Sequence, residues 1–247
     1  MIADAHTHIS IDLDTHYPHD SIETVIREMD RSHVDRCVVF PLVQGSYEEN
    51  ISFLKKVKDY SDRFIPLVFV NPLLCSEKQI DILLSDKDVK GVKINPREGK
   101  YDCRYRSILS PLMNTADRYG KHVLISYTSG DEYIDLNIIE DLVRKYTNVT
   151  FQIGHMGSIY DCSGAIRLAC EYENVYLDSC SASINALRRA VLQCPDKLMM
   201  GCDYPFGTYA SELLRIQEAC RLADREDRFE DLIGGNLLRA LKLEGRE

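Results

Sequence analysis

The stretch "IADAHTHIS" at residues 2–10 decides the fold, because its composition is that of a strand with potential metal-binding side chains. In a strand, residues two apart point to the same face of the sheet. Asp4, His6 and His8 are therefore predicted to share a face, and two neighbouring imidazoles can hold a divalent metal ion. Taken alone, the stretch leaves open a solvated N-terminus with unrelated histidines.

Similar apolar runs recur along the whole chain, rich in Val, Ile, Leu, Phe and Tyr and bounded by Pro, Gly, Asp or Asn. They predict strands at residues 2–8, 36–41, 64–70, 89–95, 121–127, 149–155, 174–180 and 197–203. Segments of helical periodicity alternate with them. These predict helices at residues 21–32, 47–61, 76–86, 107–119, 134–146, 162–173, 183–194 and 209–223, followed by two short pieces at 225–233 and 236–242.

This alternation predicts an α/β fold, a (β/α)8 TIM barrel with extra C-terminal helices. A doubly wound open sheet would use fewer strand–helix units. No shift in composition, linker or low-complexity stretch divides the chain, so residues 1–247 are predicted to form a single domain.

Composition narrows the classes of partner. The net charge of −9 and the pI near 5.3 argue against nucleic acid, and no apolar stretch is long enough to span a membrane. The nine cysteines contain no Cys-x-x-Cys pair, and no signal peptide precedes residue 2. We therefore expect reduced thiols, a soluble cytoplasmic protein and a small-molecule substrate.

The active site of such a barrel lies at the carboxyl ends of the strands. His6 and His8 lie at the end of the first predicted strand, His155 at the end of the sixth and Asp203 at the end of the eighth. Separately, His155 could be a hydrogen-bonded core histidine and Asp203 could cap a helix or a turn. Together, neutral imidazoles and a carboxylate on one rim are what a metal site needs.

Five motifs resemble the metal-dependent hydrolases of the amidohydrolase superfamily. The resemblance is closest to its amidohydrolase-related (type 2) group, which includes aminocarboxymuconate semialdehyde decarboxylase. The motifs extend over nearly the whole chain: "DAHTH" (4–8), "KGVKINP" (90–96), "IGHMG" (153–157), "NVYLD" (174–178) and "MGCDYPFG" (200–207).

The resemblance implies a role for each residue. His6 and His8 match the first-strand metal ligands, and Asp203 matches the aspartate that binds metal and moves protons. His155 matches a histidine that binds metal or acts on the substrate. We therefore expect a hydrolase of small-molecule amides, esters or lactones that uses a metal-activated water, with Asp203 and His155 catalytic. Zinc is the expected ion and manganese the alternative, and barrels of this kind often pair as homodimers.

One departure from the family pattern concerns the fifth strand, which usually ends in a histidine. Here "HVLISYTSG" (122–130) offers Ser126 or Tyr127 at that position, and Tyr127, Asp131 or Glu132 could replace the missing ligand. The departure keeps open a metal-dependent decarboxylase, a metal-free lactonase and a barrel without catalysis.

Two further polar residues, Lys93 and His122, lie on predicted strands. Lys93 could be a buried paired lysine, a substrate anchor or a carbamylated, metal-bridging ligand. With Arg97 and Arg104 it suggests an anionic substrate. His122 is interpreted as structural, because it lies at the start of its strand and therefore at the opposite end of the barrel.

Overall fold

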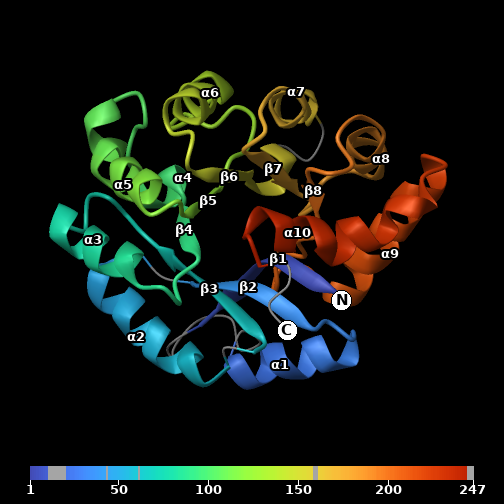
Figure 1. Ribbon diagram of the computed structural model, residues 1–247, viewed down its shortest axis with the longest axis horizontal. Helices are drawn as coiled ribbons and strands as arrows, with labels where there is room; N and C mark the ends of the chain where they lie inside the picture. The colour runs from blue at the N-terminus through green and yellow to red at the C-terminus, as the bar shows by residue number, and fades with distance from the viewer. Residues whose placement is uncertain (11–20, 43, 61, 158–160, 244–247) are drawn as a thin grey trace.

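The computed structural model describes residues 1–10, 21–42, 44–60, 62–157 and 161–243. Eight parallel strands, each hydrogen-bonded to the next along the chain, surround a central axis (Figure 1). Between the last strand and the first, Ala5 N donates to Met200 O and His8 N donates to Tyr204 O. The predicted (β/α)8 barrel is thereby confirmed. Its strands are β1 (Ala3–Ile9), β2 (Arg36–Pro41), β3 (Phe64–Phe69), β4 (Gly91–Ile94), β5 (His122–Ile125), β6 (Thr150–Ile153), β7 (Val175–Asp178) and β8 (Leu198–Met199).

Helices follow the strands and form the outer layer. They often begin at a serine, threonine or aspartate whose side chain accepts a backbone N–H; Ser21, for example, accepts from Thr24 N. The helices are α1 (Ile22–Arg31), α2 (Tyr47–Val57), α3 (Glu77–Ser85), α4 (Pro96–Gly99), α5 (Arg106–Arg118), α6 (Leu136–Lys145), α7 (Ser163–Glu171), α8 (Ile184–Gln193), α9 (Tyr209–Leu222) and α10 (Asn236–Ala240).

Three elements differ from the sequence prediction. The short helix α4 was not expected, and it begins where Asn95 accepts a hydrogen bond from Glu98 N. The predicted helix at 225–233 is instead a 3-10 turn at Glu226–Arg228 and a π-helix at Asp231–Gly235. Strand β8 has only two residues, because the next three backbone N–H groups donate to Leu232 O, Ser179 Oγ and Asp4 Oδ2.

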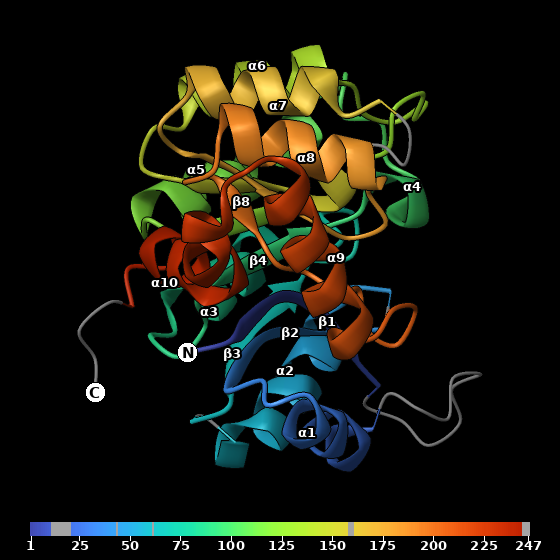
Figure 2. The ribbon, with the colours of Figure 1, turned by 90° about the vertical axis from the view of Figure 1, so that its right-hand side faces the viewer.

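The barrel interior is closed at the end where the strands begin. Leu237 and Ala240 of α10 pack on the apolar cluster that fills the interior, whose strand residues are Ala3, Ala5, Val38, Phe40, Ile65, Leu67, Leu124 and Met199. Figure 2 shows α10 and the N-terminus toward one side of the molecule and α4 toward the other. The opposite end of the barrel, formed by the carboxyl ends of the strands, is therefore the end available for a functional site.

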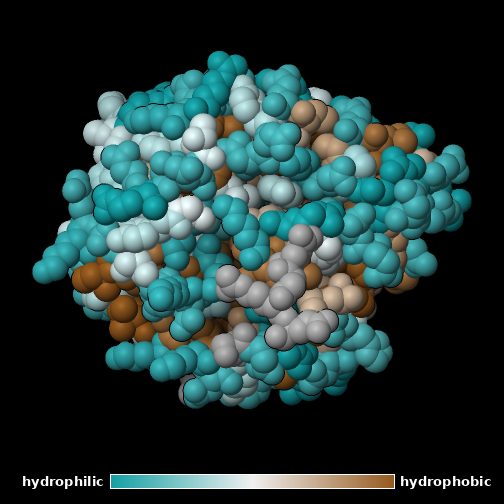
Figure 3. All heavy atoms as spheres, in the orientation of Figure 1, coloured by the Kyte–Doolittle hydropathy of each residue, from teal (hydrophilic) through white to brown (hydrophobic). Residues whose placement is uncertain are grey.

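Three further features concern the cysteines, the helices and the surface. The nine cysteines are all free, and eight of them are buried. Within the described ranges, no helix is both long and apolar enough to cross a membrane. The face that carries α10 is predominantly hydrophilic (Figure 3).

Candidate metal centre at the carboxyl ends of the strands

His6 and His8 lie on β1, whose residues are all buried. The prediction that Asp4 shares their face is wrong. The pairing of β1 with β2 shifts register between Asp4 and Thr7, and the Asp4 carboxylate accepts hydrogen bonds from Thr7 Oγ1 at 3.0 Å and from Cys202 N at 2.7 Å. Burial raises the pKa of Asp4 to about 7, although these hydrogen bonds oppose the rise.

His6 is held by a chain of buried polar side chains that crosses the barrel. Its Nδ1 lies 2.9 Å from Asp178 Oδ2, and Gln152 Nε2 donates to the same oxygen at 2.7 Å. Gln152 Oε1 in turn accepts from His122 Nε2 at 2.8 Å, and His155 N donates to Asp178 Oδ1 at 2.7 Å. Because Nδ1 of His6 donates to a carboxylate, its Nε2 carries a free lone pair.

His8 has a different environment. Its Nε2 lies 3.1 Å from Asp203 Oδ1, whereas its buried Nδ1 has no hydrogen-bond partner among the described residues. The ring stands edge-on to Phe40, with 4.7 Å between centroids, and to Phe206, with 5.6 Å. Aromatic contacts therefore orient this imidazole.

Asp203 follows β8 in a left-handed backbone conformation, with φ of 58°. Aspartate tolerates this conformation better than most residues do. Two residues earlier, a Cβ on Gly201 would come within 3.0 Å of the Asp178 Cβ and 3.2 Å of the His6 Cβ. Glycine at this position therefore lets the chain after β8 approach β1 and β7 closely enough to bring Asp203 to the histidines.

The charge states suit metal ligands. Burial, together with the nearby Lys93, lowers the pKa of His8 to about 3, so its imidazole is neutral. Burial alone would raise the pKa of Asp203, but the neighbouring His6 and His8 hold it well below its usual range. Burial also lowers the pKa of His155. At neutral pH the imidazoles of His8 and His155 are thus neutral, and Asp203 is a carboxylate.

The three donor atoms fit a divalent cation. His6 Nε2 lies 3.3 Å from Asp203 Oδ1, and His8 Nε2 lies 3.1 Å from the same oxygen. At His6 this contact places the lone pair of Nε2 against a carboxylate oxygen, and the two repel each other because no proton lies between them. A cation bound between the two atoms would remove this repulsion. Histidine nitrogens with a carboxylate are a donor set for zinc, and the Asp178 carboxylate on His6 is a usual second-layer partner.

The other predicted residues are placed as follows. The ring of His155 lies beside that of His6, with 5.1 Å between centroids, but the group of converging ligand atoms consists of His6, His8 and Asp203. A second group joins His6, Asp178 and Cys180. Burial raises the pKa of the Cys180 thiol well above its usual value, so this group offers a protonated thiol in place of a thiolate ligand.

The residues considered for the missing fifth-strand ligand lie elsewhere. Tyr127 is 5 % exposed. Its ring packs against Gly157, in the large apolar cluster formed between the strands and the helices. Asp131 accepts from Arg97 Nε at 3.0 Å and from Tyr133 N at 2.8 Å. Among the described histidines, cysteines and carboxylates, neither Asp131 nor Glu132 belongs to a group of converging ligand atoms.

The predicted cationic rim is largely compensated by carboxylates. Arg97 pairs with Asp131 at 3.0 Å, and Arg104 pairs with Asp102 at 2.6 Å. Both arginine side chains are more than half exposed. Of the three cations that suggested an anionic substrate, only Lys93 lies within the site.

Three site residues received no role from the sequence: Phe40, Gln152 and Asp178. Asp178 entered the sequence analysis only as part of the seventh predicted strand and its "NVYLD" motif (174–178). A polar Gln152 inside the apolar run "VTFQIGH" (149–155) was the available signal, since a buried amide needs partners. Phe40 gave no signal, because an aromatic residue in a buried strand is ordinary.

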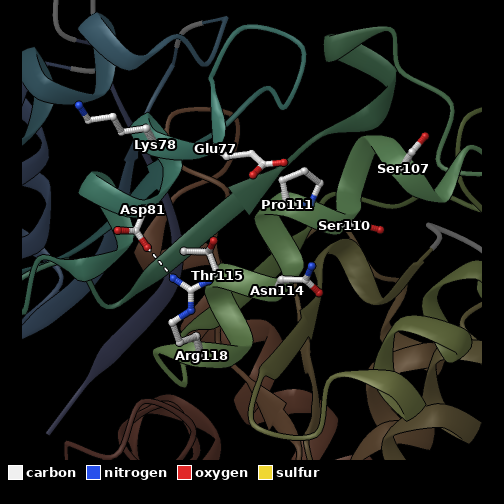
Figure 4. Close-up of a pocket in the computed structure, with 9 residues that line it drawn as sticks. All are labelled: Glu77, Lys78, Asp81, Ser107, Ser110, Pro111, Asn114, Thr115 and Arg118. Atoms are coloured by element: carbon white, nitrogen blue, oxygen red, sulfur yellow. Dashed lines mark hydrogen bonds and ion pairs between the residues drawn. The ribbon is translucent and has the colours of Figure 1, made fainter.

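A groove on the outer layer between α3 and α5 has different chemistry (Figure 4). Its lining is mainly hydroxyls, an amide and surface charges, and Arg118 Nη1 crosses it to reach Asp81 Oδ1 at 2.9 Å. It contains no histidine. The converging donors at the carboxyl ends of the strands therefore remain the candidate site.

A family comparison covers nearly the whole chain. Residues 3–243 match the family model described as amidohydrolase. No curated protein matches the chain.

Several solved structures are similar to this chain. A probable 2-pyrone-4,6-dicarboxylic acid hydrolase from Acinetobacter baumannii, with citric acid bound, is 14 % identical (TM-score 0.70; 98 % of this chain and 99 % of that chain covered). A dihydroxybenzoic acid decarboxylase from Polaromonas sp. JS666, with manganese and the inhibitor 2-nitroresorcinol, is 13 % identical (TM-score 0.70; 98 % and 97 % covered). An amidohydrolase from Burkholderia multivorans with bound zinc is 12 % identical (TM-score 0.72; 98 % and 99 % covered).

Proposed function

Because the chain belongs to the amidohydrolase family, we propose that it hydrolyses an amide, ester or lactone bond of a small molecule with the help of a divalent metal ion. The observation that carries this proposal is the convergence of His6 Nε2 and His8 Nε2 on Asp203 Oδ1, at 3.3 and 3.1 Å. The solved relatives with zinc and with manganese support either ion. Zinc is our first choice, because imidazole nitrogens dominate the donor set.

His6, His8 and Asp203 would hold the ion, which when bound lowers the pKa of a water molecule and polarises a carbonyl group. Asp203 is ionised and can accept the proton of the attacking water as general base. His155, neutral and beside His6, faces the same centre and can transfer a proton to or from the substrate. Asp178 fixes the tautomer of His6 throughout.

Decarboxylation is the second candidate. The relative from Polaromonas sp. JS666 is a decarboxylase with manganese, and His155 next to the donor atoms could take up a proton from solvent and pass it to the carbon that loses carbon dioxide. The two reactions differ in their products, so a shared substrate panel can separate them.

The first test is metal content, measured by mass spectrometry on untagged protein purified without chelator. We expect about one equivalent of metal in the wild type and in His33→Ala, which removes an exposed histidine before β2, and none in a His6→Ala, Asp203→Ala double variant. A wild-type protein that binds no metal after incubation with zinc or manganese would contradict the proposal.

The loaded protein would then be assayed with amides, esters, lactones and carboxylic acids. Water-dependent cleavage supports hydrolysis, whereas carbon dioxide release from a carboxylic acid supports the second candidate. Turnover that persists in the double variant would mean that neither reaction uses this site.

A further inference from the structure

Two cysteines lie at the ends of neighbouring helices in the outer layer of the barrel. Cys170 is in the last turn of α7, and Cys194 caps the carboxyl end of α8. These two helices lie side by side (Figures 1 and 2), and each ends just before the next strand begins. Both cysteines are therefore near the amino ends of the strands, at the end of the barrel opposite to the candidate metal centre.

The thiol of Cys170 reaches the chain beside Cys194. Cys170 Sγ lies 3.6 Å from Gln193 O, the carbonyl oxygen of the peptide bond that joins Gln193 to Cys194. Burial raises the pKa of the Cys194 thiol to about 12, and the charge of the Cys170 thiol and its hydrogen bond to Cys194 are the next causes of this rise. A hydrogen bond between two thiols requires neighbouring sulfur atoms, so the two side chains face each other.

The two thiols differ in their access to solvent. Both are free, but Cys170 is exposed, whereas Cys194 is only 5 % exposed. The other eight cysteines of the chain are all buried, so an oxidant in solution reaches Cys170 first. Cys194 then lies beside the oxidised sulfur, and the charge of Lys197 opposes the effect of burial on its pKa, which favours the thiolate that can attack.

We propose that Cys170 and Cys194 form a redox-active pair, which a low-molecular-weight disulfide such as glutathione disulfide closes into a disulfide bond between α7 and α8. The Cys170 thiolate attacks one sulfur of the added disulfide, which forms a mixed disulfide and expels one thiolate. The Cys194 thiolate then attacks Cys170 Sγ and expels the second thiolate. Two protein thiols are thus oxidised, one added disulfide is reduced to two thiols, and the two protons pass to the leaving thiolates through solvent.

The bond would stabilise the barrel. It closes a loop from Cys170 to Cys194 that contains β7 and α8. Such a loop restricts the unfolded chain far more than the folded protein, in which the two helix ends are already neighbours. We therefore expect the oxidised protein to unfold at a higher temperature than the reduced protein. This inference does not depend on the proposed function, because neither cysteine belongs to the metal centre.

The experiment treats the reduced protein with glutathione disulfide, alkylates the remaining thiols after denaturation and maps the unreduced peptides by mass spectrometry. It compares wild type, Cys170→Ser and Cys220→Ser. Cys220 is a matched control, since it is a buried cysteine on α9, the helix that follows α8. We expect peptides joined through Cys170 and Cys194 in the wild type and in Cys220→Ser. In Cys170→Ser, we expect Cys194 to be fully alkylated.

Thermal unfolding of the same samples is the second measurement. Oxidation should raise the melting temperature by about 5 to 10 °C in the wild type and in Cys220→Ser, and should leave that of Cys170→Ser unchanged. A mixed disulfide that persists on Cys170 while Cys194 stays a free thiol would overturn the inference. A covalent dimer joined through Cys170, or an oxidised wild type that is no more stable than the reduced protein, would also overturn it.

Discussion

The imidazole of His6 has polar partners at both of its nitrogen atoms, Asp178 at Nδ1 and Lys93 at Nε2. The imidazole of His8, two residues along the same strand, has polar partners only at Nε2. His6 Nδ1 donates to Asp178, and Gln152 and His122 extend this chain across the barrel. His8 Nδ1 has no hydrogen-bond partner among the described residues, and two aromatic rings flank its imidazole.

This difference separates two ways of presenting a ligand. A hydrogen bond to a carboxylate fixes both the tautomer and the direction of the ring, whereas edge-on aromatic contacts fix the direction alone. His6 is also fully buried, while His8 is 8 % exposed. We therefore expect His6 to be the fixed reference of the site and His8 to be the ligand that adjusts.

The largest effect concerns the far end of the chain that supports His6. Burial lowers the pKa of His122 to about 4 from the usual 6.5. Between these values the unfolded chain binds more protons than the folded protein, so stability falls as the pH falls from 6.5 toward 4. The pKa difference corresponds to a loss of about 3 kcal/mol.

The measurement is the free energy of unfolding by denaturant at several pH values between 7 and 4. His122→Gln should have a shallower pH dependence than the wild type, by about that amount, although the buried His8 still contributes its own acid sensitivity to both proteins. Identical slopes in the two proteins would show that His122 does not remain neutral in the folded state.

The next effect acts on His6 directly. Asp178→Asn keeps the size of the side chain but replaces a carboxylate oxygen with an amide, so His6 Nδ1 and Gln152 lose a shared charged acceptor. We expect zinc affinity to fall by about 10- to 100-fold. The measurement is competition with a chromophoric chelator.

Glu212→Gln is the matched control for this change, because Glu212 is also a buried carboxyl, and its side chain pairs with Arg215 instead of the imidazoles. It should bind zinc like the wild type. If both variants lost zinc equally, the loss would reflect general loosening of the barrel, and the special support of His6 would be contradicted.

These same residues show how much of the site could be predicted from the sequence. The strand alternation and the rule that barrel sites lie at the carboxyl ends of strands were enough to bring His6, His8, Asp203 and the neighbouring His155 together. The face of Asp4 was mispredicted, because a register shift in β1 breaks the two-residue periodicity. Periodicity carries no information about such a shift.

The residues that support the ligand His6 could not be predicted either, for a different reason. Gln152 and Asp178 act through contacts across the barrel, and which interior side chains meet there depends on strand register and tilt. The residues predicted to replace the missing histidine all belong to the fifth strand or to the loop that follows it, whereas the role of Lys93 was left open. Lys93 lies on the neighbouring strand, and only the spatial arrangement shows its nitrogen between the two imidazoles.

The smallest effect is expected on the His8 side. Phe206 is 56 % exposed, and its ring stands perpendicular to the His8 ring. Exposed aromatic pairs lie at the lower end of the range of about 0.5 to 1.5 kcal/mol, so Phe206→Ala should weaken zinc binding by only about two- to threefold.

Leu214→Ala serves as the control for loss of an exposed apolar side chain, since Leu214 on α9 is 65 % exposed. Both variants would be measured in the same chelator competition as Asp178→Asn. A tenfold or larger loss in Phe206→Ala alone would mean that the aromatic contact holds His8 as firmly as the carboxylate holds His6. The two histidines would then be equally fixed, and His8 would not be the adjustable ligand.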